Sequence, residues 1–300
     1  MSLIKLSRIF LVFSAVAVIG SIVLLIVPGP MLSMEFTGGT LMNITLPEGT
    51  TKADIQGAID GFRDAEDKSL GYFTLSMTHE GGLIIRSRTL NNEEHLALLA
   101  HLENVTGSTI EEKQFTTIGP TVGETLKRRS IEALVVASIG IVLYIAFAFY
   151  RVPRKLSPWR FGVFAVVAMI HDLLITTGIF VILSRITNFE FDTLFITALL
   201  TVLGYSVNDT IIIFDRIREN VAYAPKSENF SITAERSLRE TIVRTINTSI
   251  TTLIMLFCLY FLGSESVRWF ILALIVGIGL GNYSSYFVAT PLLVFLRKKE

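Results

Sequence analysis

Asp209 lies inside a long apolar run. Residues 193–214 are numerous and apolar enough to cross a bilayer, and Asp209 stands five residues before the end of this run. A carboxylate at membrane depth costs on the order of 3 kcal/mol even on the lenient insertion scale. Because ionisable groups at this depth mark ion paths and proton relays, we predict that Asp209 carries a coupling proton.

A second acidic residue, Asp172, lies near the middle of the apolar run 161–184, directly after His171. We expect Asp172 to belong to the same proton pathway, with His171 in a supporting role. The alternative is that His171 or hydroxyl groups of the bundle hold Asp172 in a structural bond. The sequence leaves both interpretations open.

Arg244 opens the apolar run 245–262 from the same side of the membrane as Asp209. A reversible proton carrier needs a carboxylate whose proton affinity is raised by desolvation and lowered by an approaching cation. Asp209 and Arg244 would supply both effects if their helices are neighbours. Asn208 and Thr210 flank the acid and are expected to orient it.

These residues require a membrane-embedded helix bundle to position them. Hydrophobic residues make up 51% of the 300 residues and the formal net charge is zero, which favours a membrane protein and gives no indication of nucleic-acid binding. Each of six apolar runs is long enough for a hydrocarbon core of about 30 Å. The runs are residues 9–27, 131–150, 161–184, 193–214, 245–262 and 269–296. The first is too long for a typical signal peptide, so we interpret it as an uncleaved anchor.

The basic residues of the short loops predict the orientation of the bundle. One side carries most of them, whereas the other has only Arg185 and Arg268 in its short loops. We therefore expect both termini to be cytoplasmic, although Lys127, Arg128 and Arg129 abut the second span on the outer face. The basic residues of the cytoplasmic side are Lys5, Arg8, Arg151, Arg154, Lys155, Arg160, Arg216, Arg218, Arg244, Arg297, Lys298 and Lys299.

About a hundred residues between the first two spans form an external domain. Periodic patterns predict, in order, a strand at 35–46, a helix at 52–63, a hairpin of strands 72–78 and 83–88 around Glu80, a helix at 91–103 and a strand at 108–117. The order βαββαβ is typical of a small ferredoxin-like α+β domain. The predicted parts are a stub with the first span (1–30), the external domain (31–118), and a juxtamembrane segment with five further spans (119–300).

Several catalytic patterns are absent from the sequence. It contains no GxxxxGK[ST], GxSxG or HExxH motif, and its single cysteine, Cys258, excludes an intramolecular disulfide. His95 and His101 are expected on a solvated helix face without a metal site. We predict no enzyme, metal or cofactor. The energy would come from an ion crossing the membrane potential, about 2.3 kcal/mol per charge at 100 mV.

Ordered motifs along the chain resemble the SecF family, accessory subunits of the Sec protein translocase. GYSVNDTIIIFDRIREN at 204–220 resembles the family's fourth-span signature. EFTGGT at 35–40 resembles the opening of its external domain, and IGPTVGETL at 118–126 resembles its juxtamembrane segment. RTINTSITTL at 244–253 and the glycine-rich last span fit as well, so the resemblance covers essentially the whole chain.

The resemblance implies half of a SecDF unit, within the resistance-nodulation-division superfamily, in the cytoplasmic (inner) membrane of a prokaryote. Its partners would be SecD, the SecYEG channel, exported unfolded polypeptides and membrane lipid, and its energy source the proton motive force. Asp209 and Arg244 match the family's proton-pathway residues. Where the family commonly has an Asn-Gln-Thr run, this chain has Arg239, Glu240 and Thr241, so Glu240 competes for Arg244 along one helix.

Three other interpretations stay open from sequence. One is an ion-driven exporter of small molecules or lipids in the same superfamily, although such proteins usually have twelve spans and two external domains. Another is a passive assembly factor of the translocon, with Asp209 as a polar packing group. The third, an intramembrane enzyme built on His171 and Asp172, lacks a nucleophile or metal set. The GxxxG step of Gly277 and Gly281 in the last span fits packing against SecD or against the chain's own helices.

Overall fold

The computed structural model describes residues 3–47, 49–64, 69–78, 81–149, 158–225 and 227–296. It divides into a membrane unit (Met1–Met31 and Ile131–Glu300) and an external unit (Leu32–Ser130). The external unit therefore extends further along the chain than the predicted 31–118. Some residues used for the predictions lie outside the described part of the chain: Glu80, Arg151, Arg154, Lys155, Arg297, Lys298 and Lys299.

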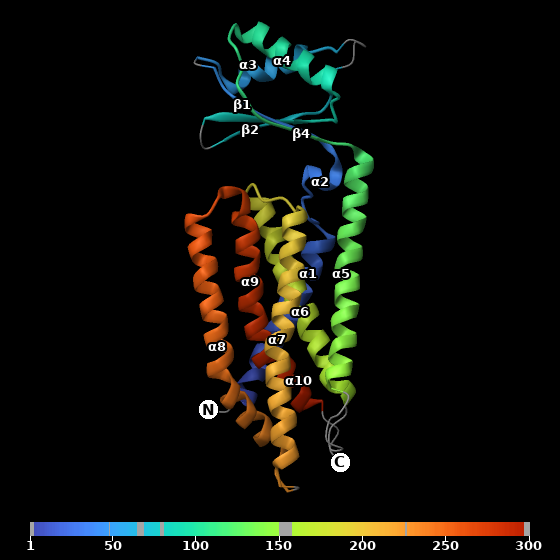
Figure 1. The fold of residues 1–300 in the computed structure, drawn as a ribbon, viewed down its shortest axis with the longest axis vertical. Coiled ribbons are helices and arrows are strands. Elements are labelled where there is room, and N and C mark those ends of the chain that lie inside the picture. Colours follow the sequence, from blue (N-terminus) through green and yellow to red (C-terminus); the bar gives the residue numbers. More distant parts are fainter. Residues whose placement is uncertain are drawn as a thin grey trace. The chain divides into compact units, whose positions relative to one another are not determined.

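The membrane unit contains the predicted spans. Within the described residues, six helical segments are long and apolar enough to cross a membrane, which confirms the predicted number (Figure 1). They are α1 (Leu3–Ile26), α5 (Pro120–Ala148), α6 (Pro158–Ile186), α7 (Thr193–Tyr223), α8 (Phe230–Leu262), and the last span, composed of η1 (Glu265–Val267), α9 (Arg268–Ser284), η2 (Ser285–Ala289) and α10 (Thr290–Phe295).

The helices differ in how much of their apolar stretch is buried. About half of it is buried in α6, in α7 and in the last span, whereas α1, α5 and α8 leave most of theirs exposed. Along α7 the buried side chains recur every three or four residues, as expected for a helix that turns one face to the interior. Asp192 caps the start of α7, accepting a hydrogen bond of 2.7 Å from the Phe195 amide.

Two glycines bring α9 into close contact with α7. A Cβ atom at Gly281 would lie 2.9 Å from the Ser206 Cα, and one at Gly277 would overlap the Val202 side chain. Gly279, between them, has no neighbour within 4 Å. The GxxxG step therefore packs against a helix of the same chain, the second of the two uses predicted for it.

The last span is interrupted by the π-helical turn η2. Single π turns inside α-helices are frequent at functional sites. Here the turn follows Ser284, and Ser284, Ser285 and Tyr286 are all buried. Three consecutive side chains of the last span thus contribute to the interior of the bundle at the π turn.

The external unit is a four-stranded antiparallel sheet with two helices on one face (Figure 1). The strands are β1 (Gly39–Thr45), β2 (Thr74–Met77), β3 (Gly82–Ser87) and β4 (Glu112–Ile118), in the order β2-β3-β1-β4. The helices are α3 (Lys52–Gly61) and α4 (Asn92–Thr106). This arrangement is compatible with the predicted ferredoxin-like domain.

Alternate residues of β1 and β3 face the helices and build the core of the external unit. Met42 and Ile44 from β1 pack with Leu83 and Ile85 from β3 against apolar side chains of α3 and α4. One prediction for this unit was wrong: the expected strand at 35–46 begins with a short helix, α2 (Met34–Thr37). The Ser33 side chain caps this helix by accepting from the Glu35 amide, which directs the segment away from extended backbone.

The prediction for His95 was also wrong, because this side chain is buried rather than solvated. Its Nε2 lies 2.9 Å from Glu112, and its ring stacks on Phe115 with 3.7 Å between centroids. Both partners belong to β4, which follows α4 in the chain. A helical periodicity alone did not reveal that this strand supplies a carboxylate and an aromatic ring.

The two glycine motifs at the ends of the external unit meet each other. Gly38 has a φ of +75°, and a Cβ there would lie 3.0 Å from the Pro120 Cα. A Cβ at Gly123 would lie 2.9 Å from the Gly38 nitrogen. Only glycine allows these backbones to approach so closely. The motifs EFTGGT and IGPTVGETL thus close the external unit at one point.

Candidate functional site

Asp209 is fully buried in the membrane unit, at 0% exposure. Neither of its carboxylate oxygens has a hydrogen-bond partner among the described residues. Ser249 on α8 is also buried, and its hydroxyl accepts a hydrogen bond of 2.8 Å from Asn282 Nδ2. A buried acid with two unfilled oxygens is rare, because buried polar groups are normally bonded.

The residues on either side of Asp209 point elsewhere. Asn208 is exposed, and the Thr210 hydroxyl bonds to that of Ser285 at 2.8 Å. Consecutive helical residues are 100° apart, so α7 turns these three side chains to three different neighbours. We expected Asn208 and Thr210 to orient the Asp209 carboxylate. The structure shows neither side chain bonded to it.

Asp172 is equally buried, but its oxygens are occupied. One oxygen lies 2.8 Å from His171 Nδ1, and the other accepts hydrogen bonds from the hydroxyls of Ser206 and Ser284. These bonds connect α6 with α7 and α9. Asp172 thus has the bonding of a structural link between three helices, the alternative that the sequence left open.

Arg244 is exposed on α8, and its side chain has no ion pair or hydrogen bond within the described residues. Glu240 does not pair with it. That carboxylate accepts from Arg216 Nε at 2.7 Å and from Asn220 Nδ2 at 2.8 Å, both on α7. The structure joins Arg244 neither to Asp209 nor to Glu240.

A row of hydroxyl groups on α8 was missed in the sequence. Every fourth residue from Ser237 to Ser249 carries one, and all four side chains are buried: Ser237, Thr241, Thr245 and Ser249. Residues four apart share one helix face. This spacing was a readable signal that runs from Ser237 into the RTINTSITTL motif, which contains Thr245 and Ser249. Tyr286, which bonds to Thr245, gave no such signal.

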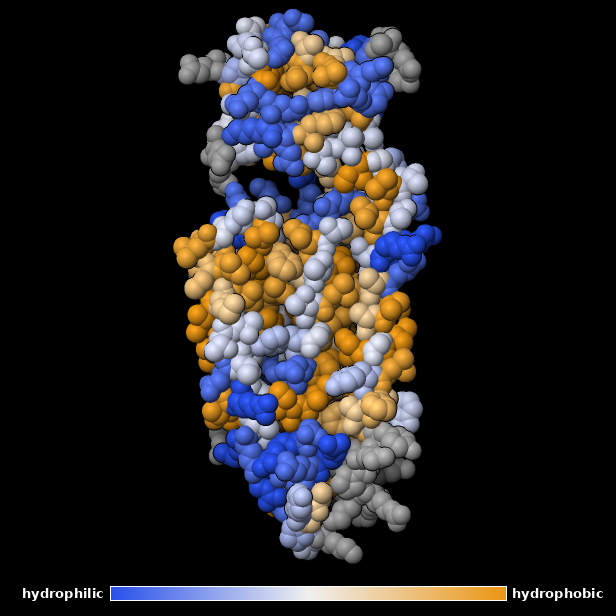
Figure 2. Space-filling view, in the orientation of Figure 1, coloured by the Kyte–Doolittle hydropathy of each residue, from blue (hydrophilic) through white to orange (hydrophobic). Residues whose placement is uncertain are grey.

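Polar side chains are exposed on α7 and α8 at membrane depth. We call them the polar face: Thr197, Thr201 and Asn208 on α7, with Arg244, Asn247, Thr248 and Thr251 on α8. The Tyr205 hydroxyl joins the two helices by donating to the Thr248 carbonyl at 3.3 Å. Pale and blue atoms accordingly interrupt the orange band over these helices in Figure 2. The threonine hydroxyls donate to carbonyls of their own helices, whereas hydrocarbon cannot satisfy the charged and amide side chains of this face.

The comparisons with known proteins agree with this geometry. The model of the family "Protein export membrane protein SecD/SecF, C-terminal" matches residues 98–299. The chain belongs to the SecD/SecF family. SecF from Thermobaculum terrenum is 40% identical over 298 residues, covering 97% of this chain and 92% of that protein. SecF from Synechocystis is 34% identical, covering 88% of this chain and 82% of that protein.

A solved structure supports the same SecF-type assignment. The crystal structure of SecDF from Thermus thermophilus, a translocon-associated membrane protein, is similar over 98% of this chain, with a TM-score of 0.80 and 30% identity. This chain spans only 38% of the length of that SecDF chain. The SecF-type chain is thus a membrane component of a protein translocase, a transport subunit rather than a catalytic enzyme.

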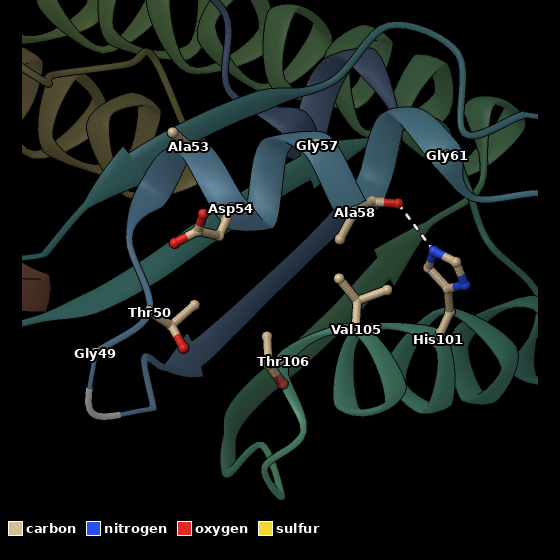
Figure 3. A pocket seen from close by; sticks show the side chains of 10 residues that line it. All are labelled: Gly49, Thr50, Ala53, Asp54, Gly57, Ala58, Gly61, His101, Val105 and Thr106. Atoms are coloured by element: carbon tan, nitrogen blue, oxygen red, sulfur yellow. Dashed lines mark hydrogen bonds between the residues drawn. The ribbon is translucent and has the colours of Figure 1, made fainter.

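The external unit of this SecF-family chain has an open groove of about 640 Å³ between α3 and α4 (Figure 3). Ala53, Gly57 and Gly61 line it from α3, and Val105 lines it from α4. His101 lies at its end and donates from Nε2 to the Ala58 carbonyl at 3.0 Å. This histidine fastens α4 to α3, and the described residues contain no cluster of three or more His, Cys, Asp or Glu that could hold a metal.

Proposed function

We propose that this SecF-family subunit works with SecD in the cytoplasmic membrane of a prokaryote. Together they would use the proton motive force to complete the translocation of unfolded polypeptides delivered through the SecYEG channel. The observation that carries this proposal is the buried Asp209, neither of whose oxygens has a hydrogen bond from the part of the chain that the structure describes. Burying an isolated carboxylate ion costs far more than burying the neutral acid, so the position suits a group that takes up and releases a proton.

The polar face supports a second helical bundle as partner. The threonine hydroxyls of this face donate to carbonyls of their own helices. Its arginine and two asparagines would face lipid, where each unsatisfied group costs several kcal/mol. A neighbouring bundle with polar side chains would satisfy them. The greater length of the similar SecDF chain is consistent with a second half that covers this face.

The orientation belongs to the same proposal. The excess of basic residues in one set of short loops favours cytoplasmic termini, with the external unit on the outer side. A subunit that pulls polypeptides outward would need its external unit on the outer side of the membrane.

The decisive test is Asp209→Asn in vesicles that contain the subunit with SecD and SecYEG. Asparagine keeps the shape of the side chain but cannot take up a proton. We expect normal insertion, normal assembly and loss of the gradient-driven part of export. Asp215→Asn is the matched control, since Asp215 is an exposed acid on the same helix. Full proton-dependent export by Asp209→Asn would refute the carrier role and favour the passive assembly factor.

A further inference from the structure

His171 lies in the interior of the membrane unit and is only 4% exposed. Its Nδ1 atom lies 2.8 Å from an oxygen of Asp172, the next residue of α6. Its Nε2 atom is buried as well and has no hydrogen-bond partner among the described residues. Buried polar atoms are normally bonded, so one ring nitrogen of His171 is occupied and the other is open.

The bonds of Asp172 limit where protons can be exchanged. An imidazole nitrogen and a carboxylate oxygen 2.8 Å apart share one proton, whichever of the two atoms holds it. The second Asp172 oxygen accepts from the hydroxyls of Ser206 on α7 and Ser284 on α9. Nε2 of His171 is therefore the atom of the pair that can gain or lose a proton without breaking a hydrogen bond.

The charge of the pair depends on this nitrogen. With a proton on Nε2 the His171–Asp172 pair is neutral overall, and without it the pair carries one negative charge. Burial of a net charge is costly, which favours uptake of the proton. The two serine hydroxyls stabilise the carboxylate when the pair is negative, which favours release. Imidazole is also the side chain that exchanges a proton near neutral pH.

The titratable and charged groups on the neighbouring helices are engaged elsewhere. Tyr283 on α9 stacks on the His171 ring with 6.1 Å between centroids, but its hydroxyl donates to a backbone carbonyl of α1. Tyr286 bonds to α8. Arg8 on α1 lies over an aromatic ring of α10, 5.2 Å from its centroid. Within the described residues, no further cation forms an ion pair with the carboxylate of the pair.

The pair is bonded to the helix that carries Asp209. Ser206, which donates to Asp172, lies three residues before Asp209 on α7, and residues three apart are neighbours on one helix face. Asp209 itself has no hydrogen bond from the part of the chain that the structure describes. The His171–Asp172 pair thus meets α7 one turn away from this acid.

We propose that His171 Nε2 is a second proton-binding site of the membrane unit, and that Asp172 is the residue that positions it. The lone pair of Nε2 forms a bond to a proton delivered by water, and on release this N–H bond breaks and the proton returns to water. Asp172 keeps its hydrogen bonds in both states. The inference rests on the proposed proton-driven function and adds a second site to the proton path of Asp209.

The test counts the protons on the His171 ring by nitrogen nuclear magnetic resonance. The sample is the full chain, isotope-labelled at histidine, in lipid vesicles with unlabelled SecD. The other three histidines fall in the external unit's part of the sequence, and the His171 signals are assigned by their loss in His171→Asn. We expect one more ring proton at low pH than at high pH, with the change confined to Nε2.

Two variants test whether the carboxylate positions this exchange. Asp172→Asn removes the negative charge, so the ring should lose its second proton at a pH roughly 1 to 3 units lower. Ser284→Ala removes a donor from the carboxylate and leaves more of its charge for the ring, so we expect a rise of roughly 0.5 to 1 unit. Ser284→Ala alone decides the point where Asp172→Asn is too unstable to reconstitute.

Thr176→Val is the matched control, since it removes a buried hydroxyl of the same helix that has no hydrogen bond among the described residues. It should leave the pH of the exchange unchanged. Shifts of Asp172→Asn and Ser284→Ala in one common direction, or an equal shift in Thr176→Val, would indicate general loosening of the bundle and overturn the positioning role of Asp172.

Export measured on the same vesicles completes the test. His171→Asn retains an amide donor for Asp172 but cannot take up a proton, so we expect it to lose most of the gradient-driven export. A ring whose proton count is constant from about pH 5 to about pH 9, or full gradient-driven export by His171→Asn, would overturn the inference. Full export by Asp209→Asn with loss in His171→Asn would refute the role proposed for Asp209 and leave His171 in place.

Discussion

Asp172 and Asp209 are both buried acids at membrane depth, yet they differ in bonding. Asp172 is held by His171, Ser206 and Ser284, whereas Asp209 has no bond within the described residues. The sequence predicted the depth of both acids. It did not reveal the difference, because two of the three groups that hold Asp172 come from helices that are distant in the sequence.

We expect Asp172→Asn to destabilise the membrane unit. The amide nitrogen would replace an oxygen that now accepts a hydrogen bond, which places a donor against a donor and costs about 1–3 kcal/mol. The thermal midpoint of the purified subunit should fall, whereas Asp209→Asn should leave it nearly unchanged. If Asp172→Asn instead kept its thermal stability and lost proton-driven export, Asp172 would be a proton carrier.

For Arg244 we predict a loss of export without a loss of stability, the opposite of the prediction for Asp172. Its exposed side chain has no bond within the described part of the chain, so Arg244→Ala should leave the thermal midpoint of the lone subunit unchanged. In the complete translocase we expect this variant to lose most of the gradient-driven export, and Arg244→Lys to retain part of it.

Glu240→Gln is the control for Arg244. Because Glu240 bonds to Arg216 and Asn220 near the surface, we expect at most about 1 kcal/mol of destabilisation and nearly normal export. Should Glu240→Gln reproduce the defect of Arg244→Ala, a local pair on α8 would be the important contact after all.

Among the elements, the close packing of α9 on α7 positions the whole site. Gly281 lies against Ser206, and Ser206 in turn bonds to Asp172. The π turn that follows directs Ser284 to α6, Ser285 to α7 and Tyr286 to α8. One short stretch of the last span therefore bonds to α6, to α7 and to α8.

We expect Gly281→Ala to destabilise the membrane unit by about 1–3 kcal/mol, because its Cβ would press against the backbone of α7. Gly279→Ala is the matched control on the same helix, since nothing lies within 4 Å of its Cβ position. Thermal unfolding in detergent compares the two. Equal midpoints for both variants would contradict the close packing of α9 on α7.

The elements that the sequence predicted well are those with a strong local signal. The apolar length of the spans and the alternation in Gly39–Thr45 and Gly82–Ser87 depend on neighbouring residues only. The buried state of His95 and the partners of Glu240 depend on contacts across the fold, and the helix before β1 depends on a local side-chain cap by Ser33. Single-sequence periodicity contains no information on those contacts, which is why these predictions were wrong or incomplete.

For the whole molecule, the polar face implies a stable complex with a second bundle. We expect mild-detergent extraction and native mass measurement to give a species that contains this chain and SecD. Thr201→Trp on the polar face should reduce its fraction severalfold. Val136→Trp on α5 is the control, because this exposed valine belongs to an apolar surface. A lone chain that remains active in export without SecD would refute the complex.

The contact between Gly38 and Gly123 has a consequence for the modularity of the chain. The chain enters and leaves the external unit at one point, where the backbone at Gly38 contacts the backbone at Gly123. Domains whose ends lie together tolerate insertion and circular permutation. This unit can therefore be regarded as a cassette set between two spans, which can be exchanged for a homologous cassette if the glycine junction is carried over with it.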